Sequence, residues 1–110
     1  MANIYAPLSL PTNLNVMPVD YGTKIKQFGG DDDYTARQHI QWFKYFCDLN
    51  EIDYEDVKMR LFAQSLNTDV KDWFRGLAAG SVNTIEGFYS IFLDRWEEKK
   101  NFVQMLTNYN

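Results

Sequence analysis

The sequence predicts an all-α fold, a compact bundle of four to five helices that follows an extended N-terminal arm. From about residue 33 onward, apolar side chains recur at i, i+3, i+4 and i+7, which is the spacing of one helix face. All three prolines lie in the first 18 residues, where apolar residues are spaced irregularly between turn-forming residues. We therefore expect residues 1–30 to be an arm and residues 31–110 to be one helical domain.

The arm is expected to be extended rather than helical. Two arrangements are compatible with its composition: it is disordered, or it docks on the helical domain or on a neighbouring molecule. Its last part, residues 24–28, is expected to form a short strand or an extended tether. Phe28 ends this segment, and Gly29 and Gly30 then interrupt the chain.

The first predicted helix runs from about Asp33 to about Leu49. The run Asp31–Asp33 precedes it, and carboxylates at a helix N-terminus are favoured by the helix dipole and by free N–H groups. A calcium loop would need further oxygen ligands at alternating positions, so no metal site is predicted. His39 lies beside the inward face and is interpreted as a packed or capping residue. The inward face is Ala36, Ile40, Phe43, Phe46 and Cys47.

The second predicted helix has Asp53 as its N-cap and ends near Leu66. Lys58 and Arg60 are expected on its exposed side. Acids in a first turn interact favourably with the helix dipole, and this helix begins with two of them. The two acids are Glu55 and Asp56, and the inward face is Val57, Leu61 and Phe62.

The third predicted helix is short and runs from about Asp69 to Leu77, with Asn67 or Thr68 as its N-cap. Gly80 is expected to mark its stop near the following loop. Four apolar side chains at i, i+3, i+4 and i+7 form its inward face: Val70, Trp73, Phe74 and Leu77.

The fourth predicted helix is capped by Thr84, and its inward face is Ile85, Phe88, Phe92 and Trp96. A helical pattern resumes over residues 102–109 and continues to the last residue, so a further domain or a linker helix is expected to follow. Eight side chains are predicted to form the centre of the core: Ile40, Phe43, Val57, Leu61, Trp73, Leu77, Phe88 and Phe92.

Composition narrows the classes of function. The net charge is -4 and the basic residues are scattered, whereas a nucleic-acid binder needs a basic face, so direct nucleic-acid binding is not expected. The single cysteine, Cys47, is expected to be a buried and inert thiol in a reducing compartment. No apolar run is long enough to span a membrane. No phosphate-binding glycine loop, nucleophile elbow or catalytic constellation is present, so we expect neither an enzyme nor a cofactor.

Five landmarks follow one another in a fixed order along the chain. Each alone is unspecific, because any amphipathic helix can supply such residues, but the ordered set is distinctive. In chain order the landmarks are Phe28-Gly29-Gly30; His39 with Phe43; Arg60, Leu61, Phe62, Ser65 and Leu66; Trp73-Phe74 with Leu77; and Gly80-Ser81-Val82 and Thr84 with Phe88, Phe92 and Trp96.

This order resembles the capsid region of gag polyproteins from Ty3/gypsy-type retrotransposons, particularly those of plant elements. The resemblance covers residues 24–110. Two positions depart from the family pattern. Val70-Lys71 stands where the family often has a small residue and a charge, and Ile85 replaces the usual tryptophan.

The resemblance implies the N-terminal lobe of a gag capsid, a structural subunit that assembles with copies of itself into cytoplasmic virus-like particle shells. In the family a C-terminal lobe follows, often with a basic tail and a zinc knuckle to which RNA packaging would belong. A second hypothesis is a domesticated gag-like adaptor that binds peptides in an apolar groove, which the arm borders or occupies. A third is a helical regulatory or enzymatic domain unrelated to gag.

Overall fold

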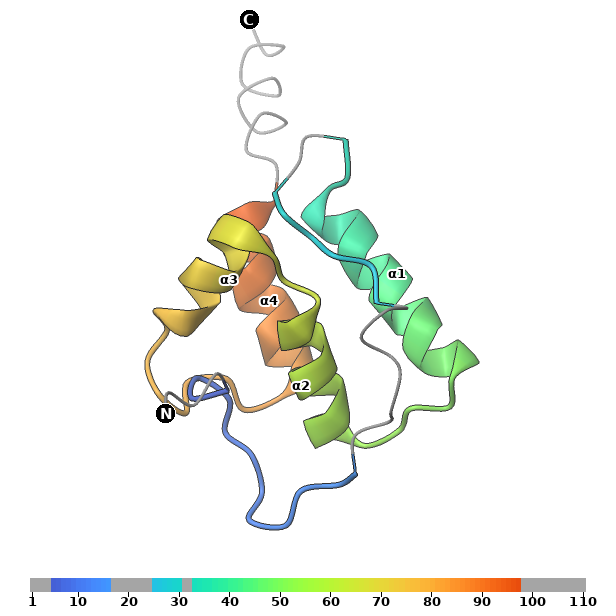
Figure 1. Ribbon diagram of the computed structural model, residues 1–110, viewed down its shortest axis with the longest axis vertical. Coiled ribbons are helices and arrows are strands. Elements are labelled where there is room, and N and C mark those ends of the chain that lie inside the picture. The colour runs from blue at the N-terminus through green and yellow to red at the C-terminus, as the bar shows by residue number, and fades with distance from the viewer. Residues whose placement is uncertain (1–4, 17–24, 31–32, 98–110) are drawn as a thin grey trace, which may run out of the picture.

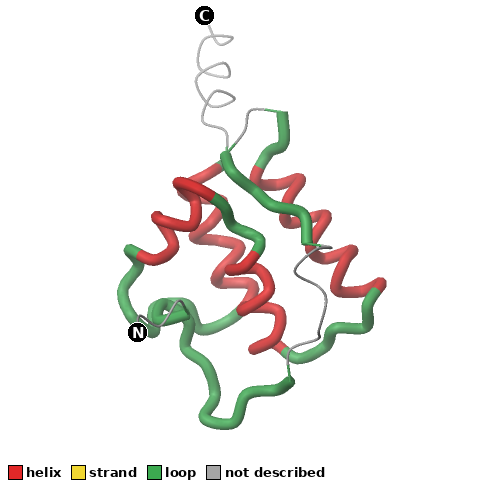
Figure 2. Tube along the Cα trace, in the orientation of Figure 1, coloured by secondary structure: helices red, strands yellow, loops and turns green. Residues whose placement is uncertain are grey.

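The computed structural model describes residues 5–16, 25–30 and 33–97, and these contain four helices. They are α1 (Ala36–Leu49), α2 (Glu55–Gln64), α3 (Thr68–Arg75) and α4 (Ile85–Trp96). Helix α4 packs against both α1 and α2, and α3 lies on the side away from α1 (Figure 1). The described residues contain two isolated β-bridges and no strand (Figure 2), so the predicted all-α fold is confirmed. The helix expected over residues 102–109 lies outside the described residues.

Helix α1 begins at a capping box rather than at the predicted aspartates. The Thr35 hydroxyl accepts a hydrogen bond from the backbone N–H of Gln38 at 3.1 Å, and the Gln38 side-chain oxygen accepts one from the N–H of Thr35 at 2.9 Å. This reciprocal pair satisfies two N–H groups that have no partner within the helix. The first turn therefore contains no acid, and Asp33 lies before the cap; Asp31 and Asp32 lie outside the described residues.

The expected N-cap of α2 is also wrong. Tyr54 is the N-cap, and it makes no side-chain capping bond. The next residue, Glu55, instead uses its carboxylate to accept a hydrogen bond from the N–H of Ile85 at 2.9 Å, at the start of α4. Long-range packing has therefore joined the beginnings of two helices through one side chain.

The caps of α3 and α4 follow the sequence more closely. Asn67 caps α3 and Thr84 caps α4, in agreement with the predictions. However, α3 ends at Arg75 with Gly76 as its C-cap, and not near Gly80, so Leu77 lies beyond the helix. Gly80 sits in the following loop with a positive φ of 71°, where a residue with a side chain would be strained.

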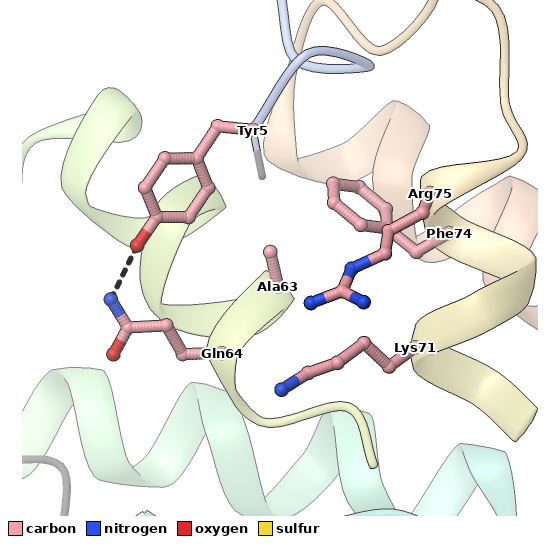
Figure 3. A pocket seen from close by; sticks show the side chains of 6 residues that line it. All are labelled: Tyr5, Ala63, Gln64, Lys71, Phe74 and Arg75. Carbon is pink, nitrogen blue, oxygen red and sulfur yellow. Dashed lines mark hydrogen bonds between the residues drawn. The ribbon is translucent and has the colours of Figure 1, made fainter. Parts of the chain in front are cut away.

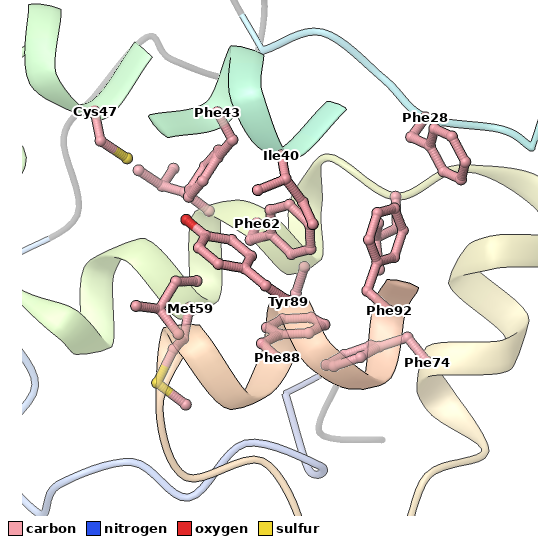
Figure 4. Packing of buried hydrophobic residues seen from close by; sticks show 14 of the residues in the cluster. Phe28, Ile40, Phe43, Cys47, Met59, Phe62, Phe74, Phe88, Tyr89 and Phe92 are labelled. Carbon is pink, nitrogen blue, oxygen red and sulfur yellow. The ribbon is translucent and has the colours of Figure 1, made fainter. Parts of the chain in front are cut away.

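The core is built from phenylalanine rings that meet edge to face (Figure 4). Phe62 of α2 lies at the centre, with ring centroids 5.1 Å from Phe43 of α1, 4.8 Å from Phe88 and 5.1 Å from Phe92 of α4. Such pairs add about 0.5–1.5 kcal/mol each to the area they bury. Six of the eight predicted core residues are buried as expected: Ile40, Phe43, Val57, Leu61, Phe88 and Phe92.

The other two predicted core residues, Trp73 and Leu77, are only partly buried. Helix α3 presents Val70 and Phe74 to the core instead, and the Phe74 ring stacks on Phe88 at 5.3 Å. Trp73 lies on the flank of this face, and Leu77 lies past the end of the helix, so neither reaches the centre. The prediction placed four residues on the buried face of α3, but this helix of eight residues buries only Val70 and Phe74.

The described parts of the arm dock on the helices of their own chain. Residues 5–16 pass below α2 in the view of Figure 1, and residues 25–30 cross between α1 and the α2–α3 pair. Each part makes one parallel bridge, Leu8 with Val82 and Phe28 with Leu66. Leu8, Ile25 and Phe28 belong to the same buried cluster as the helix side chains, so arm and helices share one core.

Candidate functional site

Phe28, at the end of the arm, brings four of the five landmarks together. Its backbone N–H donates to the carbonyl of Ser65 at 2.8 Å, and its carbonyl accepts from the N–H of Asn67 at 2.9 Å. Its ring is almost fully buried and lies 5.4 Å from His39 and 5.0 Å from Phe92. Through its ring and its backbone, this one residue of the arm therefore contacts three helical landmarks that the sequence separates widely.

His39 is fully buried, and both of its ring nitrogens are bonded. Nδ1 lies 2.9 Å from the Tyr34 hydroxyl, and Nε2 lies 2.8 Å from the Ser65 hydroxyl. Because the Ser65 hydroxyl donates to the carbonyl of Phe62, it must accept from His39, which assigns the proton to Nε2 and makes Nδ1 the acceptor for Tyr34. The histidine thus links α1 to the end of α2.

The environment keeps this imidazole neutral. Burial, with a smaller contribution from the positive charge of Lys26, lowers the pKa of His39 to about 3. Trp42 stacks on the ring at 5.5 Å, so this tryptophan contacts the core and does not stand free on the outer face of α1. The structure therefore places His39 as a packed residue, which agrees with the interpretation from sequence.

Arg60 is buried, which contradicts the expectation that it lies on an exposed side; only 7% of it is exposed. Its guanidinium pairs with Asp56 one turn earlier at 2.9 Å, and the same nitrogen donates to the carbonyl of Asn15 at 2.6 Å. The reason is tertiary: the arm covers this face of α2. We name Asn15, Asp56 and Arg60 the arm junction.

Asp56 has every oxygen of its carboxylate engaged at the arm junction. Oδ2 accepts from the Asn15 backbone N–H at 2.8 Å, and Oδ1 accepts from the Asn15 side chain at 2.7 Å. Burial alone would raise the pKa of Asp56, but the Asn15 hydrogen bonds and the positive charge of Arg60 together hold that pKa below its usual value. A buried ion pair adds little net stability, but losing one partner is costly, so the arm junction holds the arm at one position.

The last landmark also serves to hold the arm. The N–H of Gly80 donates to the carbonyl of Ala6 at 2.9 Å, and the N–H of Val82 donates to that of Pro7 at 2.9 Å. The N–H of Ser9 donates a hydrogen bond to the carbonyl of Val82 at 2.7 Å. Ser81 and Gly80 are exposed, while Val82 is buried. The Gly-Ser-Val landmark is therefore a docking loop for the first part of the arm.

The remaining predicted site residues are structural. Gly29 is half-buried beside the Thr68 side chain, and Trp96 packs its ring 6.2 Å from Trp73 and 6.4 Å from Phe28. The buried members of the set are Phe43, Leu61, Phe62, Leu66, Phe74 and Phe88. The landmarks thus describe the core and the arm contacts rather than a binding surface.

Among the cavities on the surface of the described residues, two are lined by both polar and apolar side chains. A small one of about 50 Å³ lies between the arm, the end of α2 and α3 (Figure 3). A larger one of about 260 Å³ lies between α1, α2 and α4 and mixes lysines with acids beside Cys47. Burial, more than the nearby charges, raises the pKa of that thiol to about 11, so it remains protonated and unreactive near neutral pH.

Sequence reasoning did not predict the polar contacts of the arm junction. The spacing of Asp56 and Arg60 at i, i+4 was visible and could have suggested a pair. Nothing local pointed to Asn15, which is separated from Asp56 by 41 positions. Nor did the sequence indicate that Tyr5, Lys71 and Arg75 line one cavity.

The described residues contain no group of three histidine, cysteine, aspartate or glutamate side chains that could hold a metal ion. Within the same ranges, no helix has the length and apolarity that crossing a bilayer requires. Comparison of the chain with protein-family models, with curated proteins and with solved structures found no match. The gag resemblance therefore rests on the five landmarks and stays a prediction.

Proposed function

We propose that this chain is a non-catalytic structural domain, the N-terminal lobe of a gag capsid from an LTR retrotransposon of the Ty3/gypsy type. In this proposal it assembles with copies of itself into virus-like particle shells in the reducing cytoplasm. It binds neither nucleic acid nor membrane directly. The observation that supports it best is that Phe28, His39, Phe62 and Phe92, which belong to separate landmarks of the resemblance, pack together in the core.

The way the buried polar groups are used agrees with this proposal. A shell subunit needs a rigid body whose contacts with its neighbours are repeated and individually weak. Both nitrogens of His39 are occupied by Tyr34 and Ser65, and the charges of Asp56 and Arg60 hold the arm. The buried histidine and the buried ion pair therefore fix the positions of the helices and the arm.

The experiment that tests the shell proposal is electron microscopy of the full-length protein under assembly conditions, with the 110-residue chain measured in parallel by light scattering. We expect closed particles from the full-length protein, and monomers or weak oligomers from the chain alone. Monomers of the full-length protein under every condition would contradict the proposal. A full-length Phe28→Ala variant provides the control for folding, since removing this buried ring should lower both the stability of the domain and the yield of particles.

A second candidate is the domesticated adaptor that binds a peptide in a groove bordered by the arm. One observation favours it: the small cavity is bordered by Tyr5 of the arm and by the apolar side chains of Ala63 and Phe74 (Figure 3). The neighbouring coding sequence separates the two candidates. A downstream zinc knuckle, protease and reverse transcriptase indicate a mobile element, whereas an isolated reading frame indicates a domesticated gene.

A further inference from the structure

The small cavity beside α3 has the size of a single charged group. Its volume is about 50 Å³, and one water molecule needs about 10–15 Å³ of such space, so a group of three to five heavy atoms fits. A carboxylate on its first methylene has that size. The cavity is too small for a typical cofactor, which needs about 300 Å³ or more.

Two cations project toward this cavity from consecutive turns of α3, Lys71 and Arg75 (Figure 3). The ion pairs among the described residues are Arg37 with Glu97 and Arg60 with Asp56, so no described carboxylate lies within ion-pair distance of Lys71 or Arg75. The opposite wall is Tyr5 from the arm, whose hydroxyl accepts a hydrogen bond from Gln64 at 2.5 Å. We name this site the cationic cavity.

The rest of the lining favours a carboxylate carried on an apolar stem. Ala63 and the Phe74 ring supply apolar surface between the two cations and the arm (Figure 3). Methylene groups pack on such a surface, while a guanidinium can bind both oxygens of a carboxylate at once. An aspartate or glutamate side chain matches both parts of the lining.

The chain itself contains an acidic segment whose one described member, Asp33, makes no ion pair with a described residue. The run Asp31–Asp33 is the only place where three acids are consecutive. The Thr35–Gln38 capping box occupies the N-terminus of α1, so Asp33 does not cap the helix. Asp33, the one member that the structure describes, is exposed and makes no ion pair with a described residue.

We propose that the cationic cavity binds an aspartate of the Asp31–Asp33 run of a second copy of this chain. Cavity and acidic run are different surfaces, so the contact is head-to-tail, and such contacts close into rings when the rotation between neighbours permits. The inference rests on the proposed shell function and names one of its contacts. Charge complementarity supports the choice of partner, since three consecutive aspartates of one copy would meet two cations of the other that have no described ion-pair partner.

Two complementary variants test whether the contact joins two molecules. Variant A, Lys71→Gln/Arg75→Gln, has no cationic cavity but keeps the acidic run. Variant B, Asp31→Asn/Asp32→Asn/Asp33→Asn, keeps the cavity but has no acidic run. Isotope-labelled B is titrated with unlabelled A, and the amide signals of residues 63–64 and 71–75 are followed by NMR.

We expect A to shift those signals of B in a saturable manner, while unlabelled B added to labelled B leaves them unchanged. Wild-type self-association should weaken at least tenfold in either variant, a change of about 1.4 kcal/mol. The control variants Lys58→Gln/Arg95→Gln and Asp48→Asn/Asp53→Asn/Asp94→Asn remove the same charges elsewhere and should associate like the wild type.

The proposal is overturned if A causes no shift in B, or if the control variants weaken association as much as A and B do. It is also overturned if acetate or inorganic phosphate shifts the cavity signals of B and A does not, since the site would then bind free anions only. Its failure is distinguishable from failure of the shell proposal. Full-length particles that form normally from variants A and B would refute this contact and leave the shell function standing.

Discussion

The two described segments of the arm use the same backbone device with different side-chain anchors. Residues 25–30 and residues 5–16 each form one parallel bridge to a loop between helices. Residues 25–30 are anchored by Phe28, which is 1% exposed and surrounded by rings. Residues 5–16 bury the side chain of Leu8 and are held further by the arm junction. Near the end of this segment, Val16 is 90% exposed.

This difference shows that one tether can be held in two ways. Apolar burial makes residues 25–30 part of the core, so their loss should unfold the domain. Hydrogen bonds and a buried ion pair make residues 5–16 a strap over the surface of α2, whose loss should free the strap at a lower cost. The following predictions probe this contrast, from the largest expected effect to the smallest.

Phe28→Ala should lower the free energy of unfolding by about 3–5 kcal/mol, because it removes a buried ring and leaves a cavity between α1 and α4. Chemical denaturation followed by tryptophan fluorescence measures this. Leu14→Ala in the other segment is the matched control and should change stability by less than about 0.5 kcal/mol, since Leu14 is 48% exposed and lies outside the buried cluster. Equal losses for both variants would remove the contrast between the segments.

Arg60→Met should cost about 3 kcal/mol, because it leaves the buried Asp56 carboxylate without its cation. Asp56→Asn combined with Arg60→Met should recover part of this loss, as no unpaired charge then remains. Amide hydrogen exchange provides the second readout: the Asn15 N–H should exchange faster in Arg60→Met while the Phe28 N–H stays protected. Simultaneous release of both amides would mean that the segments unfold as one unit.

Acid should destabilise the domain through His39, which packs on Phe28. The pKa of His39 is about 3 in the fold and about 6.5 in an unfolded chain, so the fold favours the neutral ring. Its contribution is fully present above pH 6.5 and is lost as the pH falls toward 3. Between pH 6.5 and 5 the loss should reach about 2 kcal/mol.

The lowered pKa of Asp56 also makes the domain less stable in acid, but only at pH values below the ordinary carboxyl range. A loss of stability between pH 6.5 and 5 therefore reports on His39. Denaturation curves at pH 6.5 and 5 measure the effect. His39→Gln is the control, and its stability should be nearly constant across the window. A native protein with the same stability at both pH values would show that the imidazole is not held neutral.

Gly80→Ala should cost about 1–2 kcal/mol, because Gly80 has a φ of 71° and supports the strap through its bond to Ala6. No atom lies within 4 Å of an added Cβ, so the cost is one of backbone strain alone. Gly76→Ala is the matched control, with a φ of -82° and ordinary contacts, and should leave the thermal midpoint unchanged or slightly raised. A neutral Gly80→Ala would mean that this loop relaxes and holds the strap loosely.

Sequence reasoning identified the helices well because their signals are local. Thr84 as a cap and the spacing of Phe88 and Phe92 are read within one or two turns. The wrong predictions involve residues with a more distant partner or a competing neighbour. The run Asp31–Asp33 was expected at the N-terminus of α1, but Thr35 is the N-cap. Glu55 was expected to interact with the dipole of its own helix, but its carboxylate accepts a hydrogen bond from the N–H of Ile85 at the start of α4.

The candidate sites were the least predictable part. The landmarks were chosen for their order in the chain, and the structure shows that most of them are core residues, which have regular spacing because they pack. The arm junction and the cationic cavity are assembled from segments far apart, such as Asn15 with Asp56, or Tyr5 with Lys71 and Arg75. No local pattern in the sequence predicts contacts between such distant segments.

Periodicity and capping chemistry were enough to establish an all-α bundle with an extended arm, because helix formation depends on neighbours three and four positions away. Which polar residues are buried depended on the tertiary structure alone. Arg60 and Asp56 look like surface residues of an amphipathic helix until the arm covers them. Lys71 and Arg75 do not stand out until α3 brings them beside Tyr5. Burial and electrostatic pairing are properties of positions in space, and the order of residues along the chain does not contain those positions directly.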